Sequence, residues 1–319
     1  MEPLSTWERG KVSGMVSLPS GQHIFVSVCG PDRVAGQPLI IIVPGVACSV
    51  KEWAAVRRLL QPTKRVLAYE RPGMGASEES CVPATAANMA RDLDALLKVL
   101  RFTPPFVLVC HSYGGIIARE FLEHRLKEKS DNNDVVGMVF VDANQEKSIV
   151  LWPDPNFEAL GKGLDWYTVT GLALRWALTD NEWKAVVDEK SSTKHQRTTE
   201  REMEHYIESC EALGTKKQLN RRPPLLHEHP ISIIRGHPEI ELRKVLTAGV
   251  EMGNGSAQQR RQFEEKLDMY PKWNERLQRE NLAMSAKSRY RDLKECGHFI
   301  HMEKPEAIVE EIEWVLENI

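Results

Sequence analysis

A serine stands where a predicted strand passes directly into a predicted helix. Residues 106–115 read FVLVCHSYGG, so that an apolar, β-rich run leads to Ser112 and two glycines open the following helix. A serine on such a sharp turn exposes its Oγ at the end of a sheet, and the residues around it must be small. Gly114 and Gly115 meet that requirement, and Cys110 is also small. A glycine-rich turn without a catalytic role fits the same letters, so this motif indicates only a candidate nucleophile.

A histidine near the C-terminus could supply the base that a serine nucleophile needs. A serine hydroxyl is a weak nucleophile at neutral pH and requires a base within hydrogen-bond reach, itself held in one tautomer. His298 follows the last predicted strand and precedes the last predicted helix. A loop therefore presents His298 at the sheet edge that carries Ser112. We interpret His111 as a packed residue of the turn, because only one side of the serine can face its base, and His301 as a packing or substrate-facing residue.

Two carboxylates compete for the role of orienting that histidine. Asp142 directly follows the strand predicted over Val135–Val141, where the strand end fixes its backbone, and rigid placement suits a group that must hold an imidazole. Glu239 follows the strand predicted over Ile231–Ile234 and lies beyond Pro238. We assign the role to Asp142 and keep Glu239 as the alternative. An aspartate that only orders a loop at the strand end would give the same pattern.

Two backbone N–H groups are candidates to stabilise a developing oxyanion. Residues 42–47 read IVPGVA and pass from a buried strand into a loop of small residues. The N–H of Val46 in this loop and the N–H of Tyr113, directly after the nucleophile, are predicted to face the reacting carbonyl oxygen. A second tight loop follows the strand that is predicted to end at Tyr69. Residues 69–77 there read YERPGMGAS.

Alternating strand-like and helix-like segments must position these residues, and this alternation favours an α/β sheet. The first two strands flank a Pro-Ser-Gly turn and suggest an antiparallel hairpin, whereas the near-continuous apolar runs that follow suit a parallel sheet buried on both faces. Strands are predicted at Ser13–Leu18, His23–Cys29, Leu39–Val43, Arg65–Tyr69, Phe106–Val109, Val135–Val141, Ile231–Ile234 and Ser288–Leu293. Helices of the core are predicted at Val50–Leu60, Ala84–Leu100, Gly114–Lys129, Lys272–Met284 and Pro305–Asn318.

The alternation stops between residues 146 and 225, where helical stretches occur without a convincing strand. We therefore divide the chain into a first part of the core (1–145), a helical cap (146–225) and a second part of the core (226–319). Trp166 and Trp176 of the cap are candidates to roof an apolar substrate pocket, although they could instead pack the cap onto the core. The charged run Asp188–His205 is interpreted as a solvated helix face and loop.

Composition limits the partners of this chain of 319 residues. A hydrophobic fraction of 42% fits a folded globular protein, and a net charge of −3 gives no electrostatic footprint for nucleic acid. The apolar runs are too short to cross a bilayer, and no secretory signal opens the chain, so we predict a cytoplasmic protein without a membrane partner. Six cysteines without metal-site spacing, and histidines without a zinc-binding helix motif, lead us to predict no metal and no cofactor. The oligomeric state is not indicated.

Taken together, the motifs resemble the α/β-hydrolase superfamily, in its serine-nucleophile branch with a helical cap. They are the Pro-Gly loop at 44–45, RPGMG at 71–75, CHSYGG at 110–115 and Gly-His at 297–298. The resemblance covers nearly the whole chain and implies an eight-stranded, mostly parallel sheet with a cap inserted after the sixth strand. Three positions depart from the common pattern of the family. Cys110 replaces a glycine, Pro44 stands where many members have histidine, and the seventh strand ends in Gly-His-Pro-Glu without the usual aspartate.

The resemblance implies hydrolysis through a serine acyl-enzyme. Ser112 would be the nucleophile, His298 the base and Asp142 its orienting acid, with Val46 and Tyr113 forming the oxyanion hole. The apolar cap favours a small-molecule ester, lactone, thioester or amide as substrate. A lyase, acyltransferase or cyclase on the same fold is the first alternative, because fold does not fix the reaction. A ligand-binding module without turnover is the second, and the intact serine–histidine pair argues against it.

Overall fold

The computed structural model describes residues 6–128 and 134–319, and its eight strands form one sheet. The strand order is β1-β2-β4-β3-β5-β6-β7-β8. Their bounds are β1 (Val12–Ser17), β2 (His23–Cys29), β3 (Leu39–Val43), β4 (Val66–Tyr69), β5 (Phe106–His111), β6 (Val135–Val141), β7 (Ile231–Arg235) and β8 (Ser288–Asp292). Strand β2 is antiparallel to both β1 and β4, and the other pairs are parallel. The predicted eight-stranded, mostly parallel sheet is confirmed.

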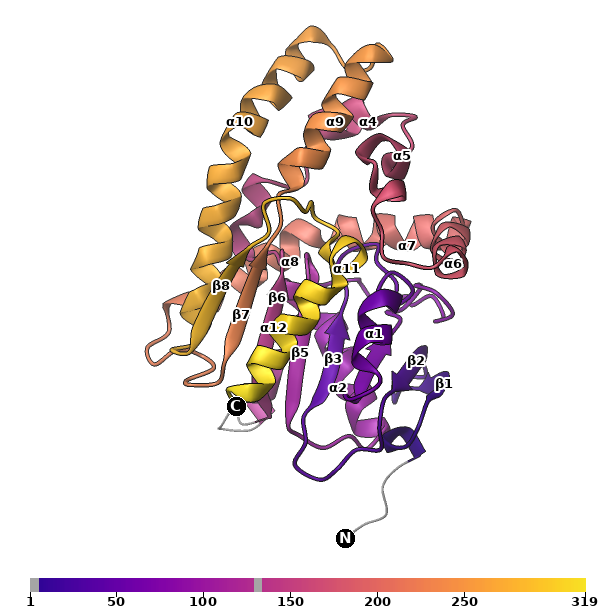
Figure 1. The fold of residues 1–319 in the computed structure, drawn as a ribbon, viewed down its shortest axis with the longest axis vertical. Coiled ribbons are helices and arrows are strands. Elements are labelled where there is room, and N and C mark those ends of the chain that lie inside the picture. The colour runs from indigo at the N-terminus through magenta and orange to yellow at the C-terminus, as the bar shows by residue number, and fades with distance from the viewer. Residues whose placement is uncertain (1–5, 129–133) are drawn as a thin grey trace.

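Helices cover both faces of this sheet, as an α/β layer arrangement requires. Figure 1 shows α1 (Ala54–Leu60) and α12 (Pro305–Glu317) on the near face, with α2 (Ala86–Val99) behind the sheet. Helix α3 (Gly114–Glu128) packs beside α2, and the last residue of the helix predicted there, Lys129, lies outside the described residues.

Strand β3 shows how one apolar run supplies both layers of the core. Successive side chains of a strand point to opposite faces of the sheet. Leu39, Ile41 and Val43 accordingly belong to the core cluster under α2 and α3. Ile40 and Ile42 belong to the cluster under α1 and α12. A run of five consecutive apolar residues is therefore what this buried central position demands.

The polypeptide between β6 and β7 is helical. Throughout residues 146–225, all of which the structure describes, there is no strand. The helices are α4 (Pro155–Gly161), α5 (Trp166–Thr170), α6 (Asp180–Lys190), α7 (Thr193–Glu204) and α8 (Tyr206–Thr215), with short 3₁₀ turns at Glu146–Val150, Leu172–Leu174 and Gln218–Asn220. Another 3₁₀ turn lies near the N-terminus at Thr6–Glu8.

Two further helices lie above the carboxyl ends of the parallel strands, where the helices between β6 and β7 also lie (Figure 1). Helices α9 (Pro238–Glu251) and α10 (Ala257–Glu280) form a pair that packs against α4, and α9 also contacts α5 (Figure 1). A 3₁₀ turn (Asn281–Met284) then leads to β8, and α11 (Ile300–Glu303) precedes α12. The upper layer is thus built from two segments of the chain. The second of these segments falls within the range that the sequence assigned to the core.

The prediction of a helix starting at Lys272 was wrong in its bounds, because α10 begins at Ala257 and passes through Pro271. A proline inside a helix loses one backbone hydrogen bond and crowds the preceding turn. Here the Pro271 carbonyl accepts a hydrogen bond of 2.8 Å from the Arg235 guanidinium of β7, so tertiary contact supports the helix at this point.

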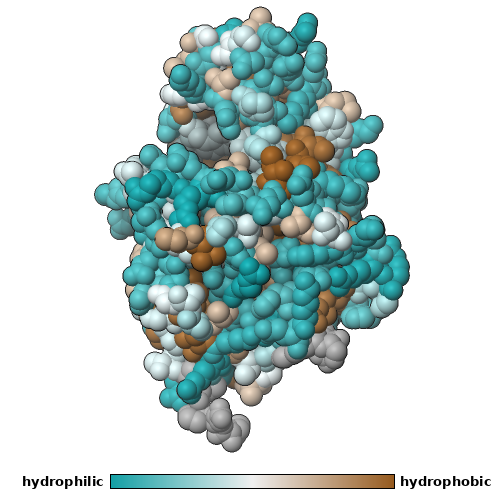
Figure 2. All heavy atoms as spheres, turned by 180° about the vertical axis from the view of Figure 1, so that it is seen from behind, coloured by the Kyte–Doolittle hydropathy of each residue, from teal (hydrophilic) through white to brown (hydrophobic). Residues whose placement is uncertain are grey.

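The outer surface agrees with the charge-rich composition. The face of the molecule seen in Figure 2 is mostly hydrophilic, and its apolar residues form small separate groups. No helix among the described residues is both long enough and apolar enough to cross a membrane.

Candidate active site

Ser112 occupies a strained turn between β5 and α3. Its φ is +51°, in the left-handed region that non-glycine residues rarely adopt. The glycines after it have no room for a side chain. A Cβ on Gly114 would lie 2.1 Å from the Val43 carbonyl oxygen, and a Cβ on Gly115 would lie 2.6 Å from the Asn144 carbonyl oxygen. The backbone therefore holds this serine at the carboxyl end of the sheet, where strain often accompanies function.

His298 and Asp142 come together at the same sheet edge. His298 Nδ1 lies 2.6 Å from Asp142 Oδ2, so the ring proton on Nδ1 is donated to the carboxylate and Nε2 is left with its lone pair. Asp142 is fixed in turn. Its N–H donates to the Ile234 carbonyl at 2.7 Å, and its Oδ1 accepts from the Gly236 N–H at 3.2 Å. The ends of β6 and β7 thus position the carboxylate that orients the imidazole.

The surroundings of His298 favour its protonated form. Burial alone would lower the pKa of His298, but the hydrogen bond and charge of Asp142 outweigh it, with a smaller contribution from Glu241, and the pKa is raised above 6.5. Glu241 accepts a hydrogen bond of 3.0 Å from the His298 backbone N–H. Burial raises the pKa of Glu241 to about 7, although the His298 contacts lower it. Glu241 has no role in the sequence-based predictions, because charged residues are common in the first turn of a helix and Glu241 lies in the first turn of α9.

Glu239, the alternative acid, has a different histidine as its partner. Its Oε1 lies 2.9 Å from His237 Nδ1, and His237 Nε2 lies 2.7 Å from Asp292 Oδ1. The structure therefore brings Asp142 to His298 and places Glu239 in a separate hydrogen-bonded group at the edge of the sheet.

The base packs against the residue that precedes the nucleophile and makes no direct hydrogen bond to the nucleophile itself. The imidazole of His298 packs against that of His111, the residue before Ser112, with 4.5 Å between ring centroids. In the described part of the chain, Ser112 Oγ makes no hydrogen bond to His298. Such bonds are often long in ligand-free sites and shorten in the substrate complex.

The loop after β3 lies directly against Ser112 and supplies a free donor. A Cβ on Gly45 would lie 2.8 Å from Ser112 Cβ, which leaves no space for a side chain between loop and nucleophile. The backbone N–H groups of Val46 and Tyr113 donate no hydrogen bond within residues 6–128 and 134–319. Two unpaired donors beside a nucleophile are what an oxyanion hole requires.

A buried ion pair holds this loop. Arg71 donates to the carbonyls of Pro44 (2.9 Å) and Gly45 (2.6 Å), and its Nε lies 2.7 Å from Glu202 Oε1. Glu202 comes from α7, in the helical segment between β6 and β7, and its Oε2 also accepts from the Ala47 N–H at 2.9 Å. Both side chains of the pair are 1% exposed. The interpretation of Asp188–His205 as a solvated face was wrong at Glu202, because the partner that neutralises it lies far away in the sequence.

We expect Glu202→Ala to lower the free energy of unfolding by about 3–5 kcal/mol, because it leaves the buried Arg71 guanidinium without a counter-ion. Urea unfolding followed by circular dichroism measures this loss. Glu200→Ala, at an exposed position of the same helix, is the matched control and should cost less than about 0.5 kcal/mol. Equal costs for the two variants would show that the ion pair does not stabilise the protein.

The two cap tryptophans have different neighbours. Trp166 lies with its ring centroid 6.2 Å from that of Phe299, which in turn lies 5.6 Å from His298. Trp176 stacks on Trp183 at 3.6 Å within the cluster between α1 and the cap. Trp166 is thus connected to the histidine through one aromatic ring, whereas the ring contact of Trp176 is made with another cap residue.

Comparison with known sequences gives matches over most of the chain. The sequence model of the "Alpha/beta hydrolase family" matches residues 40–311. An "AB hydrolase superfamily protein" of Gibberella zeae is 33% identical over 316 residues, covering 97% of this chain and 95% of that protein. A "Probable transporter efuK" of Hormonema carpetanum is 30% identical over 98% of this chain, which spans only 44% of the length of that protein.

Solved structures resemble the whole chain at low sequence identity. Cfl2 from Burkholderia cenocepacia has a TM-score of 0.62 at 16% identity, with 96% of each chain covered. The epoxide hydrolase CorEH has a TM-score of 0.59 at 15% identity, covering 96% of this chain and 99% of that chain. A serine hydrolase involved in carbazole degradation has a TM-score of 0.60 at 15% identity, covering 97% and 99%. These similarities concern the fold.

Proposed function

Because this chain belongs to the alpha/beta hydrolase family, we propose that it is a serine hydrolase whose nucleophile is Ser112. His298 is its general base, and Asp142 holds the imidazole of His298 in the productive tautomer. The observation that carries the proposal is the 2.6 Å contact between His298 Nδ1 and Asp142 Oδ2, made at the sheet edge that carries the strained serine.

The reaction follows from these positions. Ser112 Oγ attacks the substrate carbonyl carbon while His298 Nε2 takes the hydroxyl proton, and the carbonyl oxygen becomes an oxyanion facing the N–H groups of Val46 and Tyr113. The bond to the leaving group then breaks, and the imidazolium gives its proton to that group. Water, deprotonated by the same imidazole, attacks the acyl-enzyme, and the Ser112–acyl bond breaks to release a carboxylic acid while the imidazolium returns its proton to Ser112 Oγ.

The residue at the turn argues against an epoxide-opening reaction through a covalent ester. That mechanism needs a carboxylate nucleophile, and position 112 holds a serine. The likeness to an epoxide hydrolase structure is therefore limited to the fold, and our proposal does not include epoxide opening.

The aromatic side chains near the base support an apolar acyl substrate. The ring centroids of Phe157 and Trp166 are 5.7 Å apart, and those of Trp166 and Phe299 are 6.2 Å apart. These three rings come from the cap and from the residue after His298. Aromatic and aliphatic walls are typical of pockets that bind apolar molecules, so we propose an apolar ester, lactone, thioester or amide as substrate.

Product analysis in water enriched in heavy oxygen tests hydrolysis against the non-hydrolytic alternatives. An apolar aryl or alkyl ester is turned over in this water, and the acid product is measured by mass spectrometry. Hydrolysis places one solvent oxygen in the released acid, because water cleaves the acyl-enzyme. Product formation without solvent oxygen would instead indicate cyclisation, elimination or acyl transfer.

A further inference from the structure

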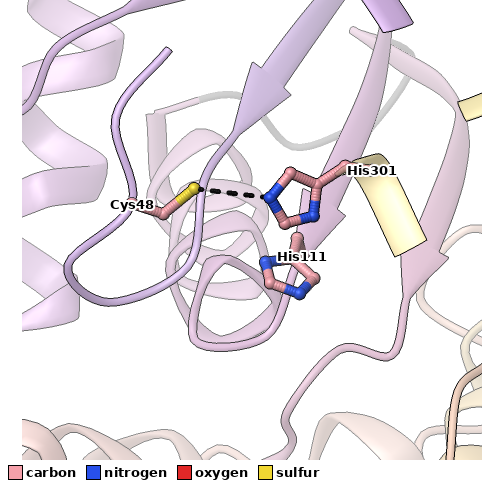
Figure 3. Close-up of side chains that lie close together, drawn as sticks. All are labelled: Cys48, His111 and His301. Atoms are coloured by element: carbon pink, nitrogen blue, oxygen red, sulfur yellow. Dashed lines mark hydrogen bonds between the residues drawn. The ribbon is translucent and has the colours of Figure 1, made fainter. Parts of the chain in front are cut away.

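The fold brings together three metal-ligating side chains that are far apart in the sequence. Cys48 lies in the loop after β3, His111 ends β5 and His301 belongs to α11. All three are buried, and one ligand atom from each lies within 4.8 Å of the others. Figure 3 shows the cysteine sulfur facing an imidazole nitrogen of His301, at 3.9 Å, with the ring of His111 beside them.

His111 presents a bare lone pair to this cluster. Its Nε2 lies 3.0 Å from the His298 carbonyl oxygen, and a carbonyl only accepts, so Nε2 carries the ring proton. The other nitrogen, Nδ1, is then an acceptor, and it is buried without a hydrogen-bond partner. Metal-binding histidines characteristically have this arrangement, in which one nitrogen donates to a carbonyl and the other is left for the ion.

His301 is held in place by packing. Trp53 stacks on its imidazole, with ring centroids 4.8 Å apart and an interplanar angle of 16°. Burial lowers the pKa of both His111 and His301 well below 6.5, so both rings are neutral at pH 7 and available as ligands. Burial also raises the pKa of the Cys48 thiol well above its ordinary value, so a cation must displace the thiol proton when it binds.

We propose that Cys48, His111 and His301 bind one Cu⁺ ion. Thiolate and imidazole are ligands that a soft d¹⁰ ion prefers. Metal–ligand bonds of about 2.0–2.3 Å place ligand atoms roughly 3.5–3.7 Å apart in a three-coordinate site. The distance between Cys48 Sγ and His301 Nε2, 3.9 Å, is already close to this value. Side-chain rotations that move the ligand atoms by about 1 Å would bring the other pairs, which lie within 4.8 Å, to the same separation.

Charge selects the monovalent ion. Cu⁺ and one thiolate cancel, so that no net charge is buried, whereas Zn²⁺ would leave one positive charge in the interior. Lys190 already supplies a cation here, because its Nζ donates to the Ala47 carbonyl at 3.3 Å and pairs with Glu52 Oε2 at 3.2 Å. That ion pair is balanced and offers no charge to compensate a divalent ion. The sequence-based prediction of no metal rested on spacing along the chain, which cannot reveal a site assembled from three separate segments.

Competition with a coloured Cu⁺ chelator, under oxygen-free reducing conditions, tests this inference. Cys81→Ser is the parent protein, because Cys81 is the exposed cysteine and could bind copper adventitiously. The parent should withdraw one Cu⁺ per chain and unfold at a higher temperature when loaded. Adding Cys48→Ser or, separately, His301→Gln should abolish both effects, whereas Cys210→Ala, at a buried cysteine outside the cluster, should change neither.

Two results would overturn the inference. One is a parent protein that withdraws no Cu⁺, or folded Cys48→Ser and His301→Gln variants that withdraw as much as the parent. The other is a cluster-dependent site that takes Zn²⁺ in preference to Cu⁺, which would contradict the charge argument. Circular dichroism establishes that each variant is folded. The readouts are metal uptake and thermal stability, so they do not depend on the proposed hydrolase activity.

Discussion

Ser112→Ala and His298→Ala are each expected to lower the turnover of an apolar aryl ester to near the background rate, a loss of about a millionfold in kcat. Without Ser112 no acyl-enzyme forms, and without His298 no group can take the hydroxyl proton. Steady-state kinetics on purified protein measures the loss. Ser80→Ala, whose hydroxyl accepts only a local hydrogen bond from the Val82 N–H in an exposed turn, is the matched control and should retain full activity.

The double variant separates a catalytic unit from two independent contributions. Residues that act in the same step do not contribute additively, so Ser112→Ala combined with His298→Ala should be little slower than either single variant. Strictly additive losses, or activity that survives either single change, would contradict the assignment of nucleophile and base.

Asp142→Asn should lower kcat by about ten-thousandfold, because an amide does not hold the imidazole in the productive tautomer. A second readout distinguishes orientation from a purely structural role. The base must be neutral to act, so kcat/KM rises with pH through the pKa of His298, which is raised above 6.5. Asp142 is the main group that raises this pKa, so the acidic limb of the residual activity should move to lower pH in the Asp142→Asn variant.

Glu239→Gln is the matched control for this prediction, because it also removes one carboxylate charge at the same end of the sheet. Glu239 pairs with His237, so we expect activity within about tenfold of the unsubstituted protein and an unchanged acidic limb. The opposite ranking of the two variants, measured on folded protein, would assign the acid to the residue after the seventh strand.

The sheet was predictable because its strands carry their signal locally. A run such as Leu39–Val43 is apolar at every position, and this pattern is typical of a strand buried on both faces. The turn at Ser112 was predictable because its glycines directly follow the serine in a recognisable motif, although the carbonyls that exclude a side chain there, those of Val43 and Asn144, come from other segments. The long helix α10 was predicted only in part, because Pro271 and many charged side chains obscure a helix that packs against α4 and α9.

Two groups of contacts between distant segments, unlike the pairing of Asp142 with His298, could not be predicted from the sequence. Glu202 is a charged residue in a charge-rich helix, which is the pattern of an exposed position. Its burial is favourable only because the Arg71 guanidinium pairs with it. The cluster of Cys48, His111 and His301 likewise has no spacing signature, because a loop, a strand end and a short helix supply one ligand each. Such side chains are paired by the tertiary fold, and a local pattern carries no information about the partner.

Labelling with a fluorophosphonate probe, followed by peptide mass spectrometry, tests the identity of the nucleophile most directly. The probe phosphonylates a serine that is activated by a neighbouring base, with loss of fluoride. We expect one label per chain, located on Ser112, no label in Ser112→Ala, and strongly slowed labelling in His298→Ala. Labelling of a different residue, or unchanged labelling of the Ser112→Ala variant, would contradict the proposal that this chain is a serine hydrolase acting through Ser112.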